Sequence, residues 1–427
     1  MKIQIPYGEG ELALEVPQER CRVVEPAVRQ TLGPPLEAFR ASLDDPLDCG
    51  RLEDLAAGRT VTYLLDDHTR AEPHADFMRA VLERLASARL VRCVLSTGCH
   101  SARTEGNERL VAQFGDIASE LGVPHEVHVH DGEDESAHVV IGETSRGTPV
   151  EADRRALDAD VFLVTSDVKN HYFAGYSNPL KNFLPGICSF ATTEWNHSFA
   201  LDAQSSFGRH PWHSDPERHV NPVAQDMLEA ATQVISGRPV FVLASVITAD
   251  GLVWSGAGAM EAVTRQAIAR TDRVGTVRVE PARYLVVSPG GDPQDETLYN
   301  AHRGLELSRN AVKEGGEILF LASCGAGMAG TAKAKEEFYD RLTAPLDEVI
   351  AGVEGRYVLY SHKAYKFARL IRSVRRITMV TELSDQEVAA AHLEKVVAPQ
   401  EVIDRWLGES QEPILITTHA NRTALYC

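Results

Sequence analysis

Several features that would define a class of protein are scarce in this chain. Its seven cysteines are odd in number and include no CxxC pair, which argues against a disulfide framework or a thiolate zinc site. The first residues lack a cationic segment followed by an apolar stretch, so they do not resemble a secretory signal. No apolar run approaches the length of a membrane span. A reducing cytoplasm is therefore the expected compartment.

Positive charge is also in short supply. The 43 basic residues face 61 acidic ones, and the net charge of -18 repels nucleic acid and anionic membranes. Any anionic ligand must therefore be attracted by local groups. Hydrophobic residues make up 44% of the chain, enough for a sizeable core, and 427 residues exceed the length at which single cores stop growing. We expect two domains and no nucleic-acid or membrane partner.

Short apolar runs at 61–65, 91–95 and 161–164 indicate strands, each followed by a polar turn, and the first two then by a helical pattern. A second series begins near residue 283 with RYLVVS, EILFLAS, YVLYS, RITMV and PILIT. This rhythm predicts two α/β domains with largely parallel sheets, and an active site at the strand carboxyl ends and the interdomain cleft. The expected domains are a catalytic and cofactor-binding domain over 1–275 and a Rossmann-like domain over 276–400. Whether about 400–427 completes the first domain is left open.

Charged and imidazole side chains follow three strands of the first series. They are Asp66, Asp67 and Arg70 after the first strand, His100 and Arg103 after the second, and Asp167, Lys169 and His171 after the third. Ligands of open α/β sheets bind beyond the carboxyl ends of the strands, so these groups are expected to form one site. The alternative is that each is a solvated or hydrogen-bonded loop residue. His100 and His171 titrate near neutral pH and would suit a general acid and base.

The segment DDHTRAEP, residues 66–73, allows two interpretations. Thr69 could cap a helix whose first turn contains Pro73, and this helix start, with Arg70 nearby, would attract a phosphate or carboxylate. Alternatively, the segment is an ordinary capped helix in which Asp67 bonds backbone amides. The sequence does not decide between them.

The segment NPLKNFLPGICSFATTEWNH, residues 178–197, is expected to begin as a shaped loop. Pro179 and Pro185 remove backbone donors, and Gly186 permits turns closed to other residues, so a regular helix or central strand is excluded there. Lys181 is a candidate for covalent attachment, because a desolvated amine can become nucleophilic. His197 is a candidate metal ligand, with a packed or surface histidine as the alternative.

A rival function comes from GAGMAG at 325–330, which matches GxGxxG, follows EILFLAS and precedes a helical pattern. The strand expected next, YVLYSHKAY, ends in His362 and Lys363 where a dinucleotide site usually has an acid for the ribose. The motif therefore indicates either a nicotinamide-dependent 2-hydroxy acid dehydrogenase or a glycine-rich turn that permits close packing.

The sequence resembles the nickel-dependent lactate racemase family. The likeness runs from MKIQIPYGEGELALEVP through DDHTR, GCHSARTEGNE and HYFAGYSNPLKNFLPGI...WNH to GGDPQDETLY at 290–299. The central block is its most specific part, because it has the family's histidine, lysine and second histidine in order and spacing.

The resemblance implies a nickel pincer nucleotide, a pyridinium-3-thioamide-5-thiocarboxylic acid mononucleotide, attached to Lys181, with His197 completing the nickel coordination. It implies His100 and His171 as the acid/base pair for racemising or epimerising a 2-hydroxy acid by reversible hydride transfer. Asp67, Thr69 and Arg70 would hold the cofactor or, for Arg70, the substrate carboxylate, and Tyr299 would contact substrate. Cofactor-synthesising enzymes are implied partners. A binding homologue without turnover is a further alternative.

Two positions depart from the family pattern. Asn178 and Pro179 stand where a Gly-Gly-type stretch is common before the lysine, and Asp292 stands where an aromatic residue is common. Both changes affect the expected substrate, which is lactate or a larger 2-hydroxy acid.

Overall fold

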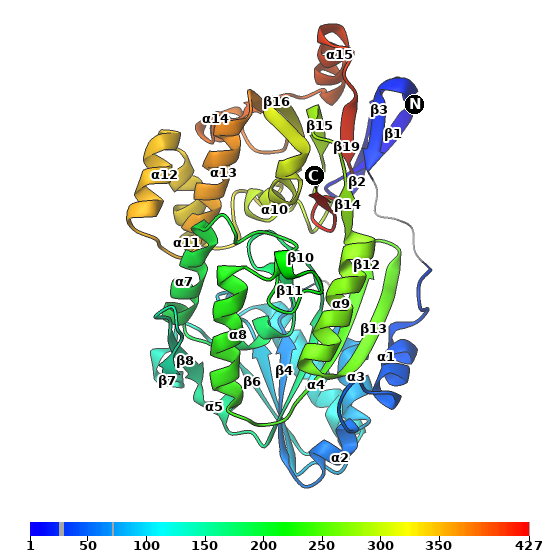
Figure 1. Cartoon of the computed structure of the whole chain (residues 1–427), viewed down its shortest axis with the longest axis vertical. Helices are drawn as coiled ribbons and strands as arrows, with labels where there is room; N and C mark the ends of the chain where they lie inside the picture. The colour runs from blue at the N-terminus through cyan, green and yellow to red at the C-terminus, as the bar shows by residue number, and fades with distance from the viewer. Residues whose placement is uncertain (25–29, 71, 427) are drawn as a thin grey trace. The chain divides into compact units, whose positions relative to one another are not determined.

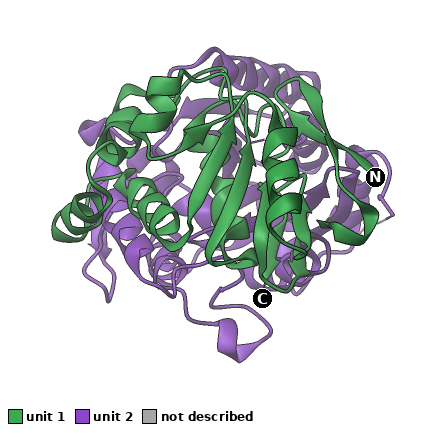
Figure 2. Ribbon diagram, turned by 90° about the horizontal axis from the view of Figure 1, so that it is seen from above, with its two compact units in different colours: residues 1–27, 275–427 green, residues 28–274 purple. Residues whose placement is uncertain are grey.

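The computed structural model describes residues 1–24, 30–70 and 72–426. The chain forms two compact units: unit 1 comprises Met1–Ala27 and Gly275–Cys427, and unit 2 comprises Val28–Val274. Figure 2 colours them separately. None of the helices in the described part of the chain has the length and apolar character needed to span a bilayer.

Unit 2 is built on a six-stranded sheet of order β13-β12-β9-β4-β5-β6, parallel except for β13 (Figure 1). Its strands are β4 (Thr60–Asp66), β5 (Leu90–Ser96), β6 (His125–Val129), β9 (Val161–Asp167), β12 (Val240–Thr248) and β13 (Gly251–Ala259). Two antiparallel hairpins accompany it, β7 (His138–Glu143) with β8 (Pro149–Asp153), and β10 (Lys169–His171) with β11 (Gly175–Ser177). The strands expected at 61–65, 91–95 and 161–164 are confirmed.

Helices cover both faces of this sheet. They are α1 (Pro35–Asp44), α2 (Leu52–Ala56), α3 (His74–Leu82), α4 (Glu105–Glu120), α5 (Arg154–Leu157), α6 (Leu180–Phe183), α7 (Phe190–Ser198), α8 (Pro222–Ile235) and α9 (Met260–Gly275). On one face Phe39 of α1, Phe77 of α3 and Phe114 of α4 pack on alternate residues of β4, β5 and β9. On the other face Phe183 of α6 meets Phe162 of β9, with ring centroids 5.4 Å apart. Both faces of the parallel sheet are thus buried, as its near-continuous apolar strands require.

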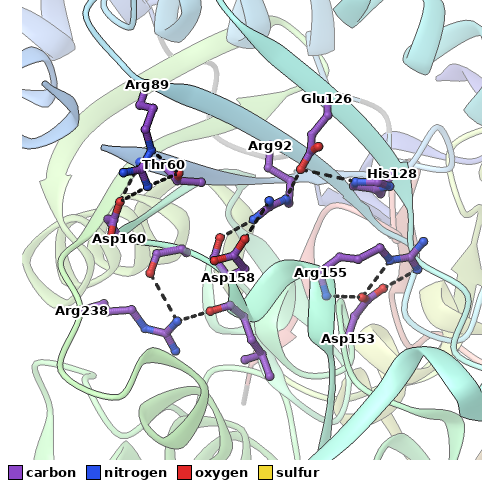
Figure 3. Close-up of polar contacts among 12 residues, drawn as sticks. Thr60, Arg89, Arg92, Glu126, His128, Asp153, Arg155, Asp158, Asp160 and Arg238 are labelled. Atoms are coloured by element: carbon purple, nitrogen blue, oxygen red, sulfur yellow. Dashed lines mark hydrogen bonds and ion pairs between the residues drawn. The ribbon is translucent and has the colours of Figure 1, made fainter. Parts of the chain in front are cut away.

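Ion pairs link neighbouring strands of this sheet at the end where the parallel strands begin. Arg89, just before β5, lies 3.0 Å from the Asp160 carboxylate that precedes β9. Arg92 pairs with Glu126 and with Asp158. Figure 3 shows these contacts, together with Arg238 donating to backbone carbonyls. The charged groups at the strands' amino ends therefore have partners of their own, and the candidate site residues belong to the opposite edge.

Unit 1 contains a second six-stranded sheet, of order β18-β17-β16-β15-β19-β3, in which all strands are parallel. They are β3 (Cys21–Val24), β15 (Ala282–Val287), β16 (Val312–Leu321), β17 (Arg376–Val380), β18 (Glu394–Lys395) and β19 (Ile414–Thr417). The hairpin of β1 (Lys2–Tyr7) and β2 (Gly10–Glu15), and the pair β14 (Thr276–Arg278) and β20 (Ala424–Tyr426), complete the strands. Its helices are α10 (Leu298–Ser308), α11 (Ala332–Lys335), α12 (Leu346–Gly355), α13 (Ser361–Ser373), α14 (Asp385–Ala390) and α15 (Pro399–Glu409).

The division of the chain differs from the expected domains at its start, and it answers the question left open for about 400–427. The first residues belong to unit 1, because β3 hydrogen-bonds in parallel to β19 rather than to a strand of unit 2. Residues 400–427 also belong to unit 1, since β19 is flanked by β15 and β3. The chain passes from unit 2 to unit 1 at 274–275.

The strand expected in YVLYSHKAYK was wrong. Residues 359 and 360 form a turn, and α13 begins at Ser361. The physical reason is the spacing of Ala364, Phe367 and Ala368, which places all three on one buried helical face.

Candidate functional site

Three loops of unit 2 start where neighbouring parallel strands end. Asp67 follows β4, His100 follows β5, and the β10–β11 hairpin that carries His171 follows β9. Because β9, β4 and β5 are adjacent in the sheet, these loops emerge side by side at one edge. The order of the strands therefore brings Asp67, His100 and His171 to the same end of the sheet.

The first pair in this site is Asp67 with His100. The Nδ1 atom of His100 lies 2.7 Å from Oδ2 of Asp67, whose other oxygen accepts the Thr69 hydroxyl at 2.5 Å. Asp67 is 1% exposed. Burial opposes its ionisation, but the imidazole of His100 and the charge of Arg70 outweigh burial, so the pKa of Asp67 lies well below its ordinary value. An ionised Asp67 holds the Nδ1 proton of His100 and leaves Nε2 for other contacts.

Thr69 does not cap a helix, so that interpretation of DDHTRAEP was wrong. Helix α3 begins at His74 with Pro73 as its N-cap residue, and no side chain caps it. Instead, the Asp67 carboxylate accepts the Thr69 backbone amide at 3.0 Å, and Arg70 N donates to the Asp67 carbonyl at 3.1 Å. These bonds close a turn over 67–70, because a short aspartate side chain can bond the backbone two residues on.

Asn107 of α4 ties together the two loops that carry this pair. Its Oδ1 accepts the His68 amide at 3.3 Å, while its Nδ2 donates to the carbonyls of Ser101 and Ala102 at 3.2 and 3.1 Å. Thr104 caps the same helix by accepting the Asn107 amide. The bonds of Asn107 thus fix both loops, in addition to the bond that joins the Asp67 and His100 side chains.

Arg70 supplies positive charge at this edge. Burial opposes its charge, yet the carboxylates of Asp67 and Asp66 raise the pKa of Arg70 above its ordinary value. In return, burial raises the pKa of Asp66 to about 6, with Arg70 opposing the rise. A guanidinium that stays charged at this edge is suited to binding a carboxylate or phosphate.

The loop that carries Lys181 takes its form from its own side chains. The Asn178 Oδ1 atom accepts the Leu180 amide at 2.9 Å, and one helical turn, α6, follows Pro179. The chain then doubles back so closely that a Cβ at Gly186 would lie 2.1 Å from the Asn182 carbonyl oxygen. The expectation of a shaped loop is confirmed, except that Lys181 occupies this single helical turn.

Lys181 and His171 are direct neighbours. The amine Nζ of Lys181 lies 3.1 Å from Nε2 of His171 and 5.8 Å from the centre of the Phe173 ring. The other ring nitrogen of His171, Nδ1, accepts the Ala174 backbone amide at 3.3 Å. This backbone bond favours the His171 tautomer with its proton on Nε2, the nitrogen that faces the amine.

His197 lies in the same group, on α7. Its ring packs edge-on against Phe173 with centroids 5.1 Å apart, so Phe173 contacts both His197 and Lys181. The side chain of Ser189 caps α7 by accepting the Thr192 amide, which fixes the helix start. Burial, assisted by the charge of Lys181, lowers the pKa of His197 to about 3. A neutral imidazole is the form that binds a metal ion.

These residues suit a metal whose other ligands come from a bound group. In the part of the chain that the structure describes, no three His, Cys, Asp or Glu side chains gather to hold a metal ion by themselves. His197 has Nδ1 directed at the Asn196 side-chain oxygen, 3.2 Å away, so Nε2 is the nitrogen suited to binding a metal. One imidazole beside an attachable amine fits a cofactor that brings its own soft donors.

Tyr299 is not placed with these residues in unit 2. It lies on α10 of unit 1, where the Lys363 amine lies 3.6 Å from the centre of its ring. Its expected contact with substrate therefore stays a prediction.

The GAGMAG loop follows β16 and precedes α11, but two of its amides, and that of the preceding Cys324, are engaged. Cys324 N and Ala326 N donate to the carbonyls of Asp295 and Glu296, and Gly327 N bonds within the loop. The acid missing from the motif is present after all: β17, the true next strand, is followed by Glu382. The occupied amides nevertheless favour the interpretation as a packed turn, because a pyrophosphate needs such groups free.

An ion network braces the hairpin that carries His171. Tyr176 of β11 donates to the carboxylate of Asp272 on α9 at 2.6 Å. Arg218 donates to the same carboxylate at 2.6 Å and His213 lies 3.0 Å from it. Burial opposes the ionisation of Asp272, but these bonds outweigh burial and lower its pKa. The hairpin is thereby fastened to the last helix of unit 2.

His210, beside this network, should make the protein acid-sensitive. It is fully buried, and burial with the charge of His213 lowers its pKa to about 3. In the unfolded chain His210 has a pKa near 6.5 and binds a proton that it does not bind in the folded chain. The free energy of unfolding therefore falls as pH drops below about 6.5. We expect His210→Phe to remove roughly 2 kcal/mol of the loss between pH 7 and pH 5, measured by urea unfolding. Equal losses in both proteins would contradict this.

Two family models match separate parts of the chain. Residues 7–208 match the family model described as the lactate racemase N-terminal domain, and residues 277–412 match that of the lactate racemase C-terminal domain. A lactate racemase of Thermoanaerobacterium thermosaccharolyticum is 28% identical over 77% of this chain and 76% of its own length. One of Lactiplantibacillus plantarum is 26% identical over 97% of both chains.

Solved structures share the fold. The lactate racemase apoprotein of T. thermosaccharolyticum aligns with a TM-score of 0.86 at 24% identity, over 100% of both chains. A Thermotoga maritima protein aligns with a TM-score of 0.65 at 14% identity, over 94% of this chain and 100% of its own. Together, the matches and the fold define an isomerase, of the racemase type. The chain belongs to the lactate racemase family.

Sequence reasoning missed Asn196, Asp226 and Phe173. Asn196 stands next to His197 in the WNH triplet, so its place in the sequence could have indicated a contact with the candidate ligand. Phe173 lies in HYFAG, next to a candidate base. Asp226 lies inside α8, among residues with an ordinary helical pattern, and carries no such signal.

Proposed function

We propose that this chain inverts the α-carbon of a 2-hydroxy acid, using His100 and His171 as acid and base and a nickel pincer nucleotide attached to Lys181. The observation that carries the proposal is a group of four side chains. His100 and His171, whose hydrogen-bond partners differ, lie with the amine of Lys181 and the neutral imidazole of His197. His100 has a carboxylate partner and His171 has an amine partner. Acid and base from different positions are what inversion of a stereocentre needs.

Lys181 and His197 are the residues that would hold the cofactor. The Lys181 amine would form the covalent link, and His197 Nε2 would donate its lone pair to nickel. When bound, the nucleotide supplies a ring that accepts the hydride of the α-carbon and gives it back. Phe173, which contacts both residues, would keep water from the attachment point.

His100 is suited to move the hydroxyl proton of one enantiomer. The buried Asp67 carboxylate accepts its Nδ1 proton, so Nε2 can take a proton while Asp67 stabilises the resulting imidazolium. Asp67 is a positioning residue in this scheme, and Thr69 supports it from the other carboxylate oxygen.

His171 is suited to the same task on the opposite face. Its Nδ1 accepts a backbone amide and its Nε2 faces Lys181. Before the cofactor is attached, an Nε2–H group can hydrogen-bond Lys181 only when the amine is uncharged, and the uncharged amine is the nucleophilic form. After attachment, Nε2 can accept the substrate hydroxyl proton only when the ring proton sits on Nδ1, so the 3.3 Å contact with the Ala174 amide must open.

Arg70 is the proposed partner of the substrate carboxylate or of the cofactor phosphate. It keeps its charge despite burial, and it is next to the Asp67 turn. Lactate is the first substrate to test, because both relatives bear the name lactate racemase. Asn178–Pro179 and Asp292 make a larger 2-hydroxy acid the second, with Tyr299 as a further contact.

The deciding experiment replaces Lys181 with alanine in protein produced together with cofactor-synthesising enzymes. We expect intact mass spectrometry to show a covalent nucleotide on the unaltered protein and none on Lys181→Ala. A chiral assay should show that racemisation falls to background. The reason is that the substitution removes the amine proposed to form the covalent link.

Lys313→Ala is the matched control, since it removes an exposed unit 1 lysine whose partner is Glu412. It should keep both the added mass and the activity. A covalent nucleotide or racemisation retained in Lys181→Ala would overturn the proposal. Reversible NAD binding with net oxidation would instead support a dehydrogenase.

A further inference from the structure

The ligand histidine has a neighbour whose orientation is fixed from outside the site. Asn196 is 0% exposed, and its amide must place NH2 and oxygen in opposite directions. Nδ2 donates to Asp226 Oδ2 at 2.8 Å and to the Val223 carbonyl at 3.2 Å. Because a carbonyl and a carboxylate only accept, the NH2 group belongs on that side. Oδ1 therefore faces His197.

Asp226 is held in turn by two hydroxyls. Thr144 donates to its Oδ1 at 2.5 Å, and Thr148 lies 2.9 to 3.0 Å from both of its oxygens. Both threonines flank the turn between β7 and β8, so the aspartate links α8 to that hairpin. Asp226 itself is 0% exposed. A buried carboxylate with every near neighbour donating to it is a rigid acceptor.

This orientation decides which nitrogen of His197 carries the proton. Nδ1 lies 3.2 Å from Asn196 Oδ1, and the Thr193 carbonyl also hydrogen-bonds the imidazole. The Asn196 oxygen beside Nδ1 is an acceptor, so the proton belongs on Nδ1. In the neutral ring Nε2 then has a lone pair. A flipped Asn196 amide would present NH2 to Nδ1 and move the proton to Nε2, where it would block a metal.

We propose that Asp226 acts through Asn196 as a positioning residue that locks His197 in the Nδ1–H tautomer, with Nε2 presented to nickel. The inference rests on the proposed function, because it assumes that His197 is the nickel ligand. It adds two residues that never touch substrate or cofactor. Partners of this kind usually change metal affinity by tenfold or more when removed.

The test uses full-length protein without cofactor and reads the His197 tautomer from ¹⁵N chemical shifts of histidine-labelled chain, with His197→Gln identifying the signal. We expect the Nδ1–H form in the unaltered protein. Asn196→Leu and Asp226→Ala should each lower the ratio of Nδ1–H to Nε2–H about fivefold, as expected for loss of one hydrogen bond. Asp226→Asn should restore the ratio, because its side-chain oxygen can still accept from Asn196.

Thr148→Val is the matched control, since it removes a bond to Asp226 without altering the Asn196 contact. It should keep the tautomer ratio even if thermal unfolding shows lower stability. In protein loaded with cofactor, nickel dissociation into a chelator should be about tenfold faster in Asn196→Leu, while the covalent mass on Lys181 stays.

Nε2–H in the unaltered protein, or an unchanged ratio in both Asn196→Leu and Asp226→Ala, would overturn the inference. These outcomes are independent of the proposed function, which fails on the mass of the Lys181 adduct. A locked tautomer with no adduct would sink the function and leave the hydrogen-bond relay intact.

Discussion

Replacing His171 with glutamine is expected to lower the racemisation rate on the order of 10³-fold, because the substrate hydroxyl on one face loses its proton acceptor. Glutamine keeps a polar side chain of similar reach but has no titrating nitrogen. His100→Gln should give a loss of similar size, since interconversion needs both faces. The measurement is the initial rate from each pure enantiomer of lactate by chiral chromatography, with intact mass confirming that the Lys181 adduct is present.

The source of the hydrogen at the α-carbon provides the control for this prediction. Solvent deuterium should not appear at the α-carbon in any variant, because the hydrogen there moves as hydride and does not exchange with water. A His171→Gln protein that keeps more than a tenth of the rate, with the adduct in place, would remove His171 from the mechanism. Deuterium at the α-carbon would point to simple proton abstraction.

Replacing Asp67 with asparagine is the second large effect, with an expected loss of 10²- to 10⁴-fold in kcat. The amide can donate to His100 Nδ1, so the imidazole would carry its proton on Nε2 and could not accept one from the substrate. Substrate binding should change less, since Asp67 acts through His100. The comparison of kcat with KM over pH 5 to 9 measures this split.

Thr69→Val is the matched variant, because it removes a hydroxyl bond to Asp67 and leaves the Asp67–His100 contact. It should lose less than tenfold in kcat.

Stability offers a second readout of the pairing between Asp67 and His100. The pKa of Asp67 is lowered by folding, so its contribution is present above pH 4 and disappears as pH falls further. The stability gap between Asp67→Asn and the unaltered protein should therefore narrow in acid. Equal kcat in Asp67→Asn would contradict the pairing.

Local patterns predicted three strands of unit 2, at 61–65, 91–95 and 161–164, and the loop around Lys181, because short apolar runs, Pro and Gly act through the backbone nearby. They failed for Thr69, where a competing turn centred on Asp67 used the bonds that a helix cap would have used. They failed for YVLYS because its apolar start resembles a strand while the buried face of α13 follows later. Short runs of this kind do not distinguish helix from strand by themselves.

The residues proposed for the site could be singled out from the sequence, whereas the residues that hold them in place could not. The sequence places His100, His171, Lys181 and His197 at strand ends and in one shaped segment. Asp226 and Asn107 come from helices, and nothing in the residues around them indicates a contact with those loops. Their roles depend on tertiary packing, which a linear pattern does not contain.

The pairing of β3 with β19 has a consequence for synthesis of the chain. An edge strand made at the start must wait for a partner made almost four hundred residues later. During translation the inserted 28–274 segment can finish its own sheet on the ribosome, while β3 still lacks the strand to which it hydrogen-bonds. Synthesis of β19 is thus the step that lets the sheet of unit 1 be completed.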